Sequence, residues 1–127
     1  MAGKRILIVD DEDDIREVAA MSLEAIGGFE VLVARSGIEA LSLAAAEQPD
    51  AILLDVMMPE MDGPTTLQRL RAEAITGSIP VIFLTAKVQP SERTRFASLG
   101  AAAVLAKPFD PLTLPAELAE ALGWPRP

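Results

Sequence analysis

The chain has 127 residues, of which 50% are hydrophobic and 24% are charged, and its 11 basic and 19 acidic residues give a net charge of -8. This composition is typical of a globular protein, and the length predicts one domain with one hydrophobic core. The acidic balance argues against binding of nucleic acid or an anionic membrane through the bare surface, because both need a basic patch.

Cysteine and histidine are both absent from the sequence. Disulfides, zinc–thiolate sites, thiol nucleophiles and Ser-His-Asp hydrolases are therefore excluded. Any chemistry must use carboxylates, hydroxyls, lysine, arginine and the backbone. The sequence shows neither a secretory signal nor an apolar run of membrane-spanning length, and the expected location is the cytoplasm.

Short apolar segments typical of buried parallel strands alternate five times with longer segments of helical character. The alternation predicts an α/β fold, a flavodoxin-like (βα)5 three-layer sandwich with a parallel five-stranded sheet in the order 2-1-3-4-5. We expect a single domain over residues 1–127, with a core of about residues 4–122. The predicted strands are Arg5–Val9, Glu30–Ala34, Ala51–Leu54, Pro80–Leu84 and Ala103–Leu105.

Capping residues and prolines predict where the helices begin and end. In the last helix, Pro115 lacks an amide hydrogen, which predicts a kink or a restarted helix. Leu112 and Leu114 are predicted to belong to the buried stripe of that helix. The predicted helices are Asp13–Ile26, one opened by a Ser36–Glu39 capping box, one with Pro64 in its first turn, one from Pro90 or Ser91 to Gly100, and one with Asp110 as N-cap and Pro111 as first residue.

Reactive side chains stand at the predicted strand ends: Asp10 and Asp11, Asp55, Thr85, and Lys107. The carboxyl ends of parallel strands meet at one rim of the sheet, which is where ligands bind in such folds. Three carboxylates gathered there repel one another, and the repulsion raises the pKa values of some of them. A cation bound among them would stabilise the cluster. Carboxylate oxygens without soft ligands fit Mg²⁺, for which we expect that Mn²⁺ can substitute.

The same residues predict a phosphoryl-transfer chemistry. A metal ion would offset the charge of an incoming phosphoryl group, so that the anionic Asp55 can attack phosphorus and form an acyl phosphate. Lys107 would supply a second positive charge, and the Thr85 hydroxyl and Ala86 amide would supply hydrogen bonds. This chemistry needs no general base, so it is compatible with the absence of histidine.

Four segments of the sequence together resemble the signatures of response regulator receiver domains, each at the end of a predicted strand. The resemblance implies that Asp55 is the phosphorylation site and that Asp10, Asp11 and the Met57 backbone carbonyl complete the Mg²⁺ site. It also implies that Thr85 is the switch hydroxyl and Lys107 the phosphate-contacting lysine. The segments are Val9-Asp10-Asp11, Leu54-Asp55-Val56-Met57-Met58-Pro59 with Met61-Asp62-Gly63, Leu84-Thr85-Ala86, and Lys107-Pro108-Phe109.

The resemblance further implies partners. The phosphoryl donor would be a sensor histidine kinase, a histidine phosphotransfer protein or a small molecule such as acetyl phosphate. The phosphorylated form would bind a downstream protein target, or a second copy, through the face of the fourth helix, fifth strand and fifth helix. The chain would then be a switch that catalyses only its own phosphorylation and dephosphorylation, and the family also allows a cis peptide bond before Pro108.

The sequence departs from the family pattern at Val104, where many receivers carry Tyr or Phe. Switching is therefore expected to depend more on Thr85 and the fourth helix. Met57 and Lys87 stand two residues beyond Asp55 and Thr85, at positions that tune phosphoryl lifetime in this family. The apolar Met57 side chain is expected to hinder the attacking water and to lengthen that lifetime.

Other functions fit less well. An aspartate-nucleophile phosphatase carries a second Asp two residues after the nucleophile, where this chain has Met57, which cannot donate a proton. A flavin carrier needs a loop rich in Gly, Ser and Thr after the first strand, where this chain has acids. A receiver used only for docking would not need the complete site. Two contexts stay open: a stand-alone regulator, and a receiver excised from a larger regulator or a hybrid kinase.

Overall fold

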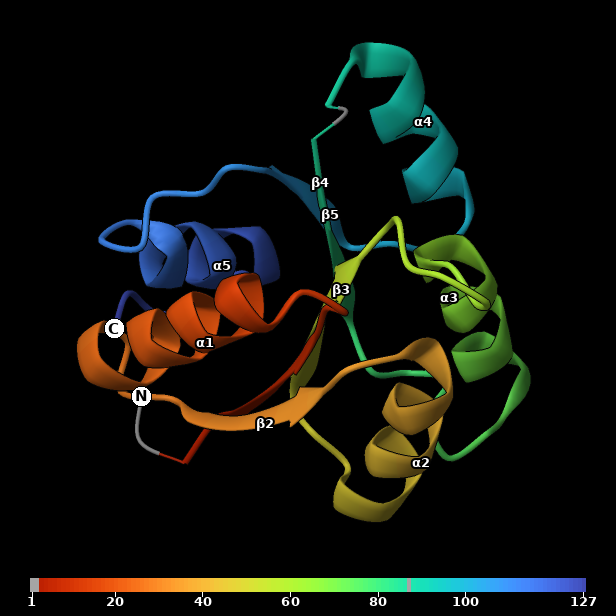
Figure 1. The fold of residues 1–127 in the computed structure, drawn as a ribbon, viewed down its shortest axis with the longest axis horizontal. Helices are drawn as coiled ribbons and strands as arrows, with labels where there is room; N and C mark the ends of the chain where they lie inside the picture. The colour runs from red at the N-terminus through yellow and green to blue at the C-terminus, as the bar shows by residue number, and fades with distance from the viewer. Residues whose placement is uncertain (1–2, 87) are drawn as a thin grey trace.

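Five parallel strands form a single sheet in the computed structural model, which describes residues 3–86 and 88–127 (Figure 1). The strand order is β2-β1-β3-β4-β5, so the predicted fold class and order are confirmed. β3, β4 and β5 each end one residue later than predicted, which makes Asp55 and Thr85 the last residues of their strands. The strands are β1 (Arg5–Val9), β2 (Glu30–Ala34), β3 (Ala51–Asp55), β4 (Val81–Thr85) and β5 (Ala103–Ala106).

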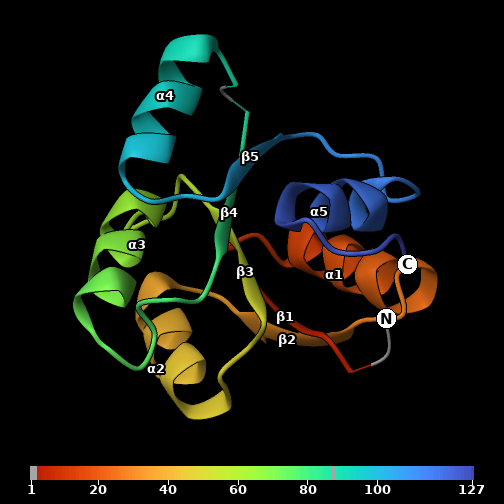
Figure 2. The same cartoon turned by 180° about the vertical axis from the view of Figure 1, so that it is seen from behind.

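Helices cover both faces of the sheet. Figures 1 and 2 show α1 and α5 on one face and α2, α3 and α4 on the other. The α1 helix continues directly into a π-helical segment, η1, and together they span the predicted first helix. The helical elements are α1 (Asp13–Met21), η1 (Ser22–Ile26), α2 (Gly37–Glu47), α3 (Gly63–Ala72), α4 (Pro90–Ser98) and α5 (Leu114–Leu122).

The two hydrophobic clusters follow from the alternation of side chains along each strand. In β1, Ile6 and Ile8 join the cluster that contains α1 and α5 residues, whereas Leu7 and Val9 join the cluster on the opposite face. All five residues of β3 are buried, as expected for a central strand covered on both sides. The central strands therefore contribute side chains to the hydrophobic clusters on both faces of the sheet.

Side-chain caps start α2 and α3. The Ser36 hydroxyl accepts a hydrogen bond from the Glu39 amide at 3.1 Å, as the capping box predicts. The Glu39 carboxylate accepts from the amide of Arg35, one residue earlier than in the standard box. At α3, the Asp62 carboxylate accepts from the Thr65 amide at 2.9 Å, a cap additional to those predicted from the sequence.

The α5 helix begins later than predicted. Asp110 caps only a short turn, in which its carboxylate accepts a hydrogen bond from the Leu112 amide at 2.9 Å. The helix restarts at Leu114, which places Pro115 in the first turn. Amides in the first turn have no hydrogen-bond partner within the helix, so the missing amide hydrogen of proline costs nothing there. The predicted restart is confirmed, but the predicted burial of Leu112 was wrong, because Leu112 lies in the turn and is 73% exposed.

The segment after α5 folds back on the body of the domain. The Trp124 amide donates to the Ala119 carbonyl at 2.8 Å, and the Trp124 ring lies 6.0 Å from the Phe29 ring. The Lys4 ammonium lies 4.8 Å from the centre of the Trp124 ring, so Trp124 links the two ends of the chain. Among the described residues, no helix combines the length and apolar character needed to cross a bilayer.

Candidate functional site

The strand register brings the predicted site residues to one edge of the sheet. Asp55, the last residue of β3, pairs with Leu84, and Thr85, the last residue of β4, pairs with Ala106. Lys107 therefore follows β5 level with Thr85, and its amide donates to the Thr85 carbonyl at 2.9 Å. Residues from distant parts of the sequence become neighbours because parallel strands end at the same edge.

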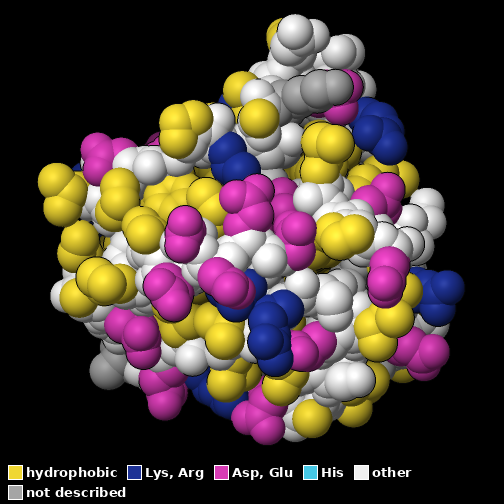
Figure 3. All heavy atoms as spheres, viewed as in Figure 1, with side chains coloured by type: hydrophobic (Ala, Val, Ile, Leu, Met, Phe, Trp, Pro, Cys, Tyr) yellow, Lys and Arg dark blue, Asp and Glu magenta, His cyan; other side chains and the backbone are white. Residues whose placement is uncertain are grey.

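Asp10, Asp11 and Asp55 form an acidic cluster at this edge. Each offers a carboxylate oxygen, and the three oxygens lie within 4.8 Å of one another. Asp10 and Asp55 are almost completely buried, whereas Asp11 is exposed. Figure 3 shows acidic side chains gathered near the middle of the face on view, over the region where β1 and β3 end in Figure 1.

Lys107 joins the two buried acids. Its ammonium nitrogen lies 3.0 Å from Asp10 Oδ2 and 3.1 Å from Asp55 Oδ1. Burial by itself would lower the pKa of Lys107, but the close contacts with the two aspartates and their negative charges outweigh it and raise the pKa. The following Lys107–Pro108 peptide bond is cis, which the family resemblance allows.

Asp55 sits in an environment that disfavours its negative charge. Burial is the largest cause, the charge of Asp10 adds to it, and together they raise the pKa of Asp55 to about 6. The Lys107 ammonium and the Met57 amide act in the opposite direction. The sequence predicted a raised pKa at this edge from crowded carboxylates; for Asp55, burial contributes more to the raised pKa than the neighbouring charge of Asp10 does.

The acidic cluster fits a divalent cation. Asp10 Oδ2 is fully buried, and no described residue donates a well-aligned hydrogen bond to it, although Lys107 lies close enough for an ion pair. A buried carboxylate oxygen that accepts no hydrogen bond reduces the stability of the fold, and coordination to a metal ion would remove this loss. Three carboxylates from two strand ends and no soft ligand match the preference of Mg²⁺. The Met57 amide lies 3.4 Å from Asp55 Oδ1, which places the Met57 backbone beside this cluster.

A hollow of about 210 Å³ opens beside the acids. Five of its six lining residues were singled out from the sequence, and Glu12 was not. Glu12 belongs to the acidic run after β1, and its amide donates to Asp10 Oδ1 at 2.9 Å, which helps to orient that carboxylate. Lys87 lies outside the described residues. The lining residues are Glu12, Asp55, Met57, Thr85, Ala86 and Lys107.

Arg93 of α4 ties that helix to β5, and the sequence held no signal for it. Its guanidinium donates to the Val104 carbonyl and to the Val88 carbonyl, each at 3.3 Å. The Val104 side chain is buried in the core, as its place in an apolar strand predicts. The position of α4 relative to β5 thus depends on a side chain that reaches backbone acceptors, which no local sequence pattern encodes.

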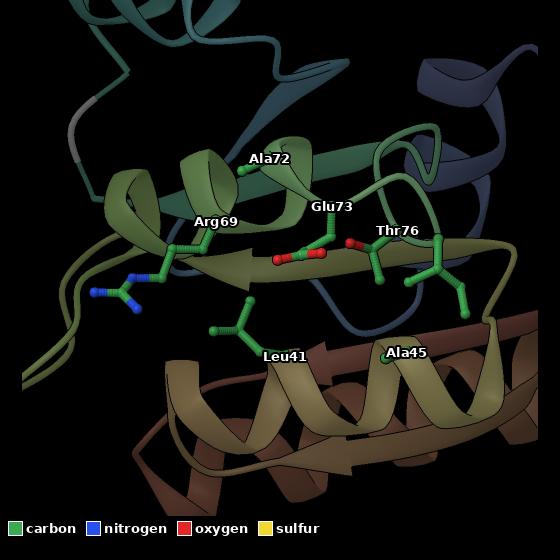
Figure 4. A pocket seen from close by; sticks show the side chains of 7 residues that line it. Leu41, Ala45, Arg69, Ala72, Glu73 and Thr76 are labelled. Carbon is green, nitrogen blue, oxygen red and sulfur yellow. The ribbon is translucent and has the colours of Figure 1, made fainter.

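A larger hollow of about 400 Å³ lies between α2 and α3, away from the strand ends. Figure 4 shows Leu41 and Ala45 of α2 facing the α3 side, where the Glu73 carboxylate points into the gap. The Thr76 hydroxyl is already bonded to the Leu70 carbonyl. This hollow lacks the combination of clustered acids and lysine, so its size does not make it the chemical site.

The sequence profile of the response regulator receiver domain matches residues 6–119, which is most of the chain. The chain therefore belongs to the response regulator receiver domain family of two-component systems. The structural comparison agrees, because the chemotaxis protein CheY4 of Vibrio cholerae superimposes with a TM-score of 0.87 at 33% identity. That superposition covers 94% of this chain and 99% of the other.

Two further relatives are similar domains that belong to larger proteins. The phosphate regulon transcriptional regulatory protein PhoB of Pseudomonas aeruginosa is 42% identical over 118 residues, which cover 93% of this chain and 51% of PhoB. The chain thus spans about half the length of the curated relatives it matches. The receiver domain of a histidine kinase from Syntrophus aciditrophicus superimposes with a TM-score of 0.81 at 32% identity, covering 95% of this chain and 91% of the other.

Proposed function

We propose that this chain accepts a phosphoryl group on Asp55 in a Mg²⁺-dependent reaction and that the modification switches a protein-interaction surface. One observation carries the proposal: the buried Asp55 carboxylate is clustered with a lysine ammonium and two further carboxylates, beside an open hollow. Membership of the receiver family supports the same assignment.

Asp10, Asp11, Asp55 and the Met57 carbonyl are the proposed ligands of Mg²⁺. When bound, the ion would supply positive charge against the phosphoryl oxygens and the crowded carboxylates. It would also favour the ionised form of Asp55, whose raised pKa otherwise leaves the carboxylate a poor metal ligand and nucleophile in mildly acidic solution.

The remaining steps belong to residues of this chain. An Asp55 oxygen attacks phosphorus, an O–P bond forms, and the P–N bond of a phosphohistidine donor, or the P–O bond of acetyl phosphate, breaks. Lys107, already 3.1 Å from Asp55 Oδ1, is placed to pair with a phosphoryl oxygen. The buried Thr85 hydroxyl lines the same hollow and is the proposed hydrogen-bond donor to another oxygen.

The switch is proposed to act as a population shift of the segment between β4 and α4, together with α4 itself. Thr85 and Lys107 would contact the phosphoryl group, and their movement would change the face formed by α4, β5 and α5. Arg93, which bonds backbone carbonyls on both sides of α4, is placed to transmit this change. The proposed partners are a sensor histidine kinase or histidine phosphotransfer protein as donor, and a downstream protein or a second copy as reader.

A second context is supported by two of the comparisons. PhoB is about twice as long as the matched region, and the Syntrophus receiver belongs to a histidine kinase. The alternative proposal is therefore that this single domain works as the receiver module of a larger regulator or a hybrid kinase. The chemistry at Asp55 would be the same in either context, and only the element that reads the switch would differ.

The first test is the intact mass of the protein after incubation with acetyl phosphate and Mg²⁺. We expect one phosphoryl adduct that disappears in Asp55→Ala and in the presence of a chelator. Asp14→Ala, which removes an exposed acid from the first turn of α1, serves as the matched control and should still be phosphorylated. Absence of the adduct from acetyl phosphate and from a panel of phosphorylated histidine kinases would refute the proposal.

A further inference from the structure

Met57 stands at the mouth of the proposed phosphoacceptor hollow. Its side chain is 72% exposed, although it follows a strand whose residues are all buried. It lines the hollow that contains Asp55 and Lys107, and also the neighbouring hollow of about 450 Å³ that reaches Arg95 of α4. The Met57 side chain is therefore largely open to solvent and forms an apolar part of the wall of the hollow that contains the reactive acid.

The other described methionines differ from Met57 in exposure or position. Met58 is 8% exposed and belongs to the hydrophobic core. Met61 is half-buried, with its sulfur beside the backbone of Gly37. Met21 is 66% exposed but lies at the end of α1 and does not line the hollow. Met57 thus combines high exposure with a place in the wall of the hollow that contains Asp55, and Met21 provides a natural comparison of similar exposure.

We propose that Met57 is a site of reversible oxidation by hydrogen peroxide and that its sulfoxide shortens the lifetime of the phosphoryl group on Asp55. This inference rests on the proposed function. In the reaction, the thioether sulfur takes one oxygen atom from peroxide, an S–O bond forms and the O–O bond breaks. The second oxygen leaves as water, sulfur loses two electrons and peroxide gains them.

The effect on lifetime follows from the polarity of the new group. A thioether is a weak hydrogen-bond acceptor, so the part of the wall that Met57 forms holds water poorly, although charged and polar side chains line the rest of the hollow. A sulfoxide oxygen is polar and accepts hydrogen bonds well, so it would hold a water molecule at the mouth of the hollow, next to the acyl phosphate. Hydrolysis of the acyl phosphate would then be faster.

Oxidation leaves the backbone of residue 57 unchanged. The proposed metal ligand at this position is the Met57 carbonyl, and the amide that contacts Asp55 is also part of the main chain. The initial rate of phosphorylation at saturating Mg²⁺ and a fixed concentration of acetyl phosphate should therefore be similar in oxidised and reduced protein. Only the rate at which the adduct disappears should change, which separates an effect on hydrolysis from a loss of metal binding.

The test begins with peptide mass mapping of the folded protein after mild peroxide treatment. We expect Met57 and Met21 to gain an oxygen atom at comparable rates and Met58 to react much more slowly. Oxidation of Met21 without oxidation of Met57 would overturn the proposal, and this readout does not depend on phosphorylation.

The decay of the phosphoryl adduct is then followed by intact mass in reduced, oxidised and methionine-sulfoxide-reductase-treated protein. We expect a severalfold faster decay after oxidation, reversed by the reductase, in the unaltered chain and in Met21→Leu. Met57→Leu keeps an apolar side chain of similar size without sulfur and should not respond to peroxide. An unchanged decay rate with Met57 fully oxidised, or an equal response in Met57→Leu, would overturn the inference while the proposed function stands. Failure of the reduced protein to form any adduct would overturn both.

Discussion

At the scale of single residues, Asp55 must carry a negative charge for the proposed chemistry, although its buried position disfavours that charge. The carboxylate is 4% exposed, lies beside the buried Asp10 and is compensated by one lysine. Its pKa of about 6 measures how strongly the fold disfavours the charge that the proposed chemistry needs. The site is therefore expected to reduce the stability of the metal-free protein.

We predict that Asp55→Asn stabilises the protein in the absence of metal. The pKa of Asp55 is raised from 3.8 to about 6 on folding, so the folded state binds the proton more tightly. Stability is consequently lost as the pH rises from about 4 to about 6, and the penalty persists above that window. Two units of pKa correspond to at most about 3 kcal/mol, which sets the upper limit of the gain.

Urea unfolding in a chelating buffer at several pH values measures this gain. The variant should be more stable than the unaltered chain above about pH 6 and equally stable below about pH 4, where Asp55 is protonated in both states. A gain that is independent of pH would show that the carboxylate charge is not its cause.

Met57 is predicted to protect the acyl phosphate from water. Replacing it by Asn removes apolar bulk from the wall of the hollow and adds a group that hydrogen-bonds water, so the phosphoryl group should be lost faster. The decay of the adduct after removal of acetyl phosphate measures the effect. Equal or slower decay in Met57→Asn would contradict it, and Met21→Asn, an exposed position outside the hollow, is the control.

At the scale of elements, the junction between β3 and α3 determines how the Asp55 loop is held. The Gly63 amide donates to the Val56 carbonyl at 2.8 Å, and the Asp62 carboxylate caps the helix that follows. A Cβ atom at residue 63 would lie 2.6 Å from the Asp55 carbonyl oxygen and 2.8 Å from Val56 Cα. Glycine is thus required at residue 63, because the backbone of Asp55 and Val56 leaves no room for a side chain.

Gly63→Ala is predicted to destabilise the protein by about 1–3 kcal/mol, because backbone atoms would have to move to accept the new carbon. Gly123→Ala is the comparison, since that residue has φ +72° but a Cβ atom there would meet open space, so only the conformational cost of about 1 kcal/mol applies. Thermal or urea unfolding gives both values. A smaller loss at residue 63 than at residue 123 would contradict the close-approach argument.

At the scale of the whole molecule, the parallel sheet gathers loops from four strands into one charged site. The chain carries a net charge of -8, and part of that charge is concentrated at the acidic cluster. Self-repulsion at this edge is relieved by a cation and increased by its removal. Binding of the cation should therefore appear as a change in global stability.

We predict that Mg²⁺ raises the melting temperature. Each tenfold increase in ion concentration above Kd should add about 1.4 kcal/mol to the free energy of unfolding. The rise should be larger at about pH 8 than at about pH 5, because a proton on Asp55 competes with the ion when the pKa is near 6. Scanning calorimetry with and without Mg²⁺ checks this. Asp14→Ala should behave as the unaltered chain, and a pH-independent rise would argue against Asp55 as a ligand.

Much of the fold was predictable from local chemistry. Short apolar runs identified the strands. The central strands β1, β3 and β4 are apolar almost throughout because they are covered on both faces, whereas the edge strands β2 and β5 are partly exposed. Asp55, Thr85 and Lys107 could be assigned to one rim because strand ends converge whatever the loop sequences are. The restart of the last helix was also visible, since Pro115 cannot donate a hydrogen bond.

Only the tertiary structure decided which side chains meet. Leu112 is apolar but exposed, because the Asp110 turn carries it out of the helical stripe that buries Leu114. Arg93 reaches backbone carbonyls of two other segments. The pKa of Asp55 depends first on its burial and then on its distances from Asp10 and Lys107. Composition and periodicity determine where a chain is apolar and where it turns. Contacts between residues distant in sequence arise only when packing fixes the segments relative to one another.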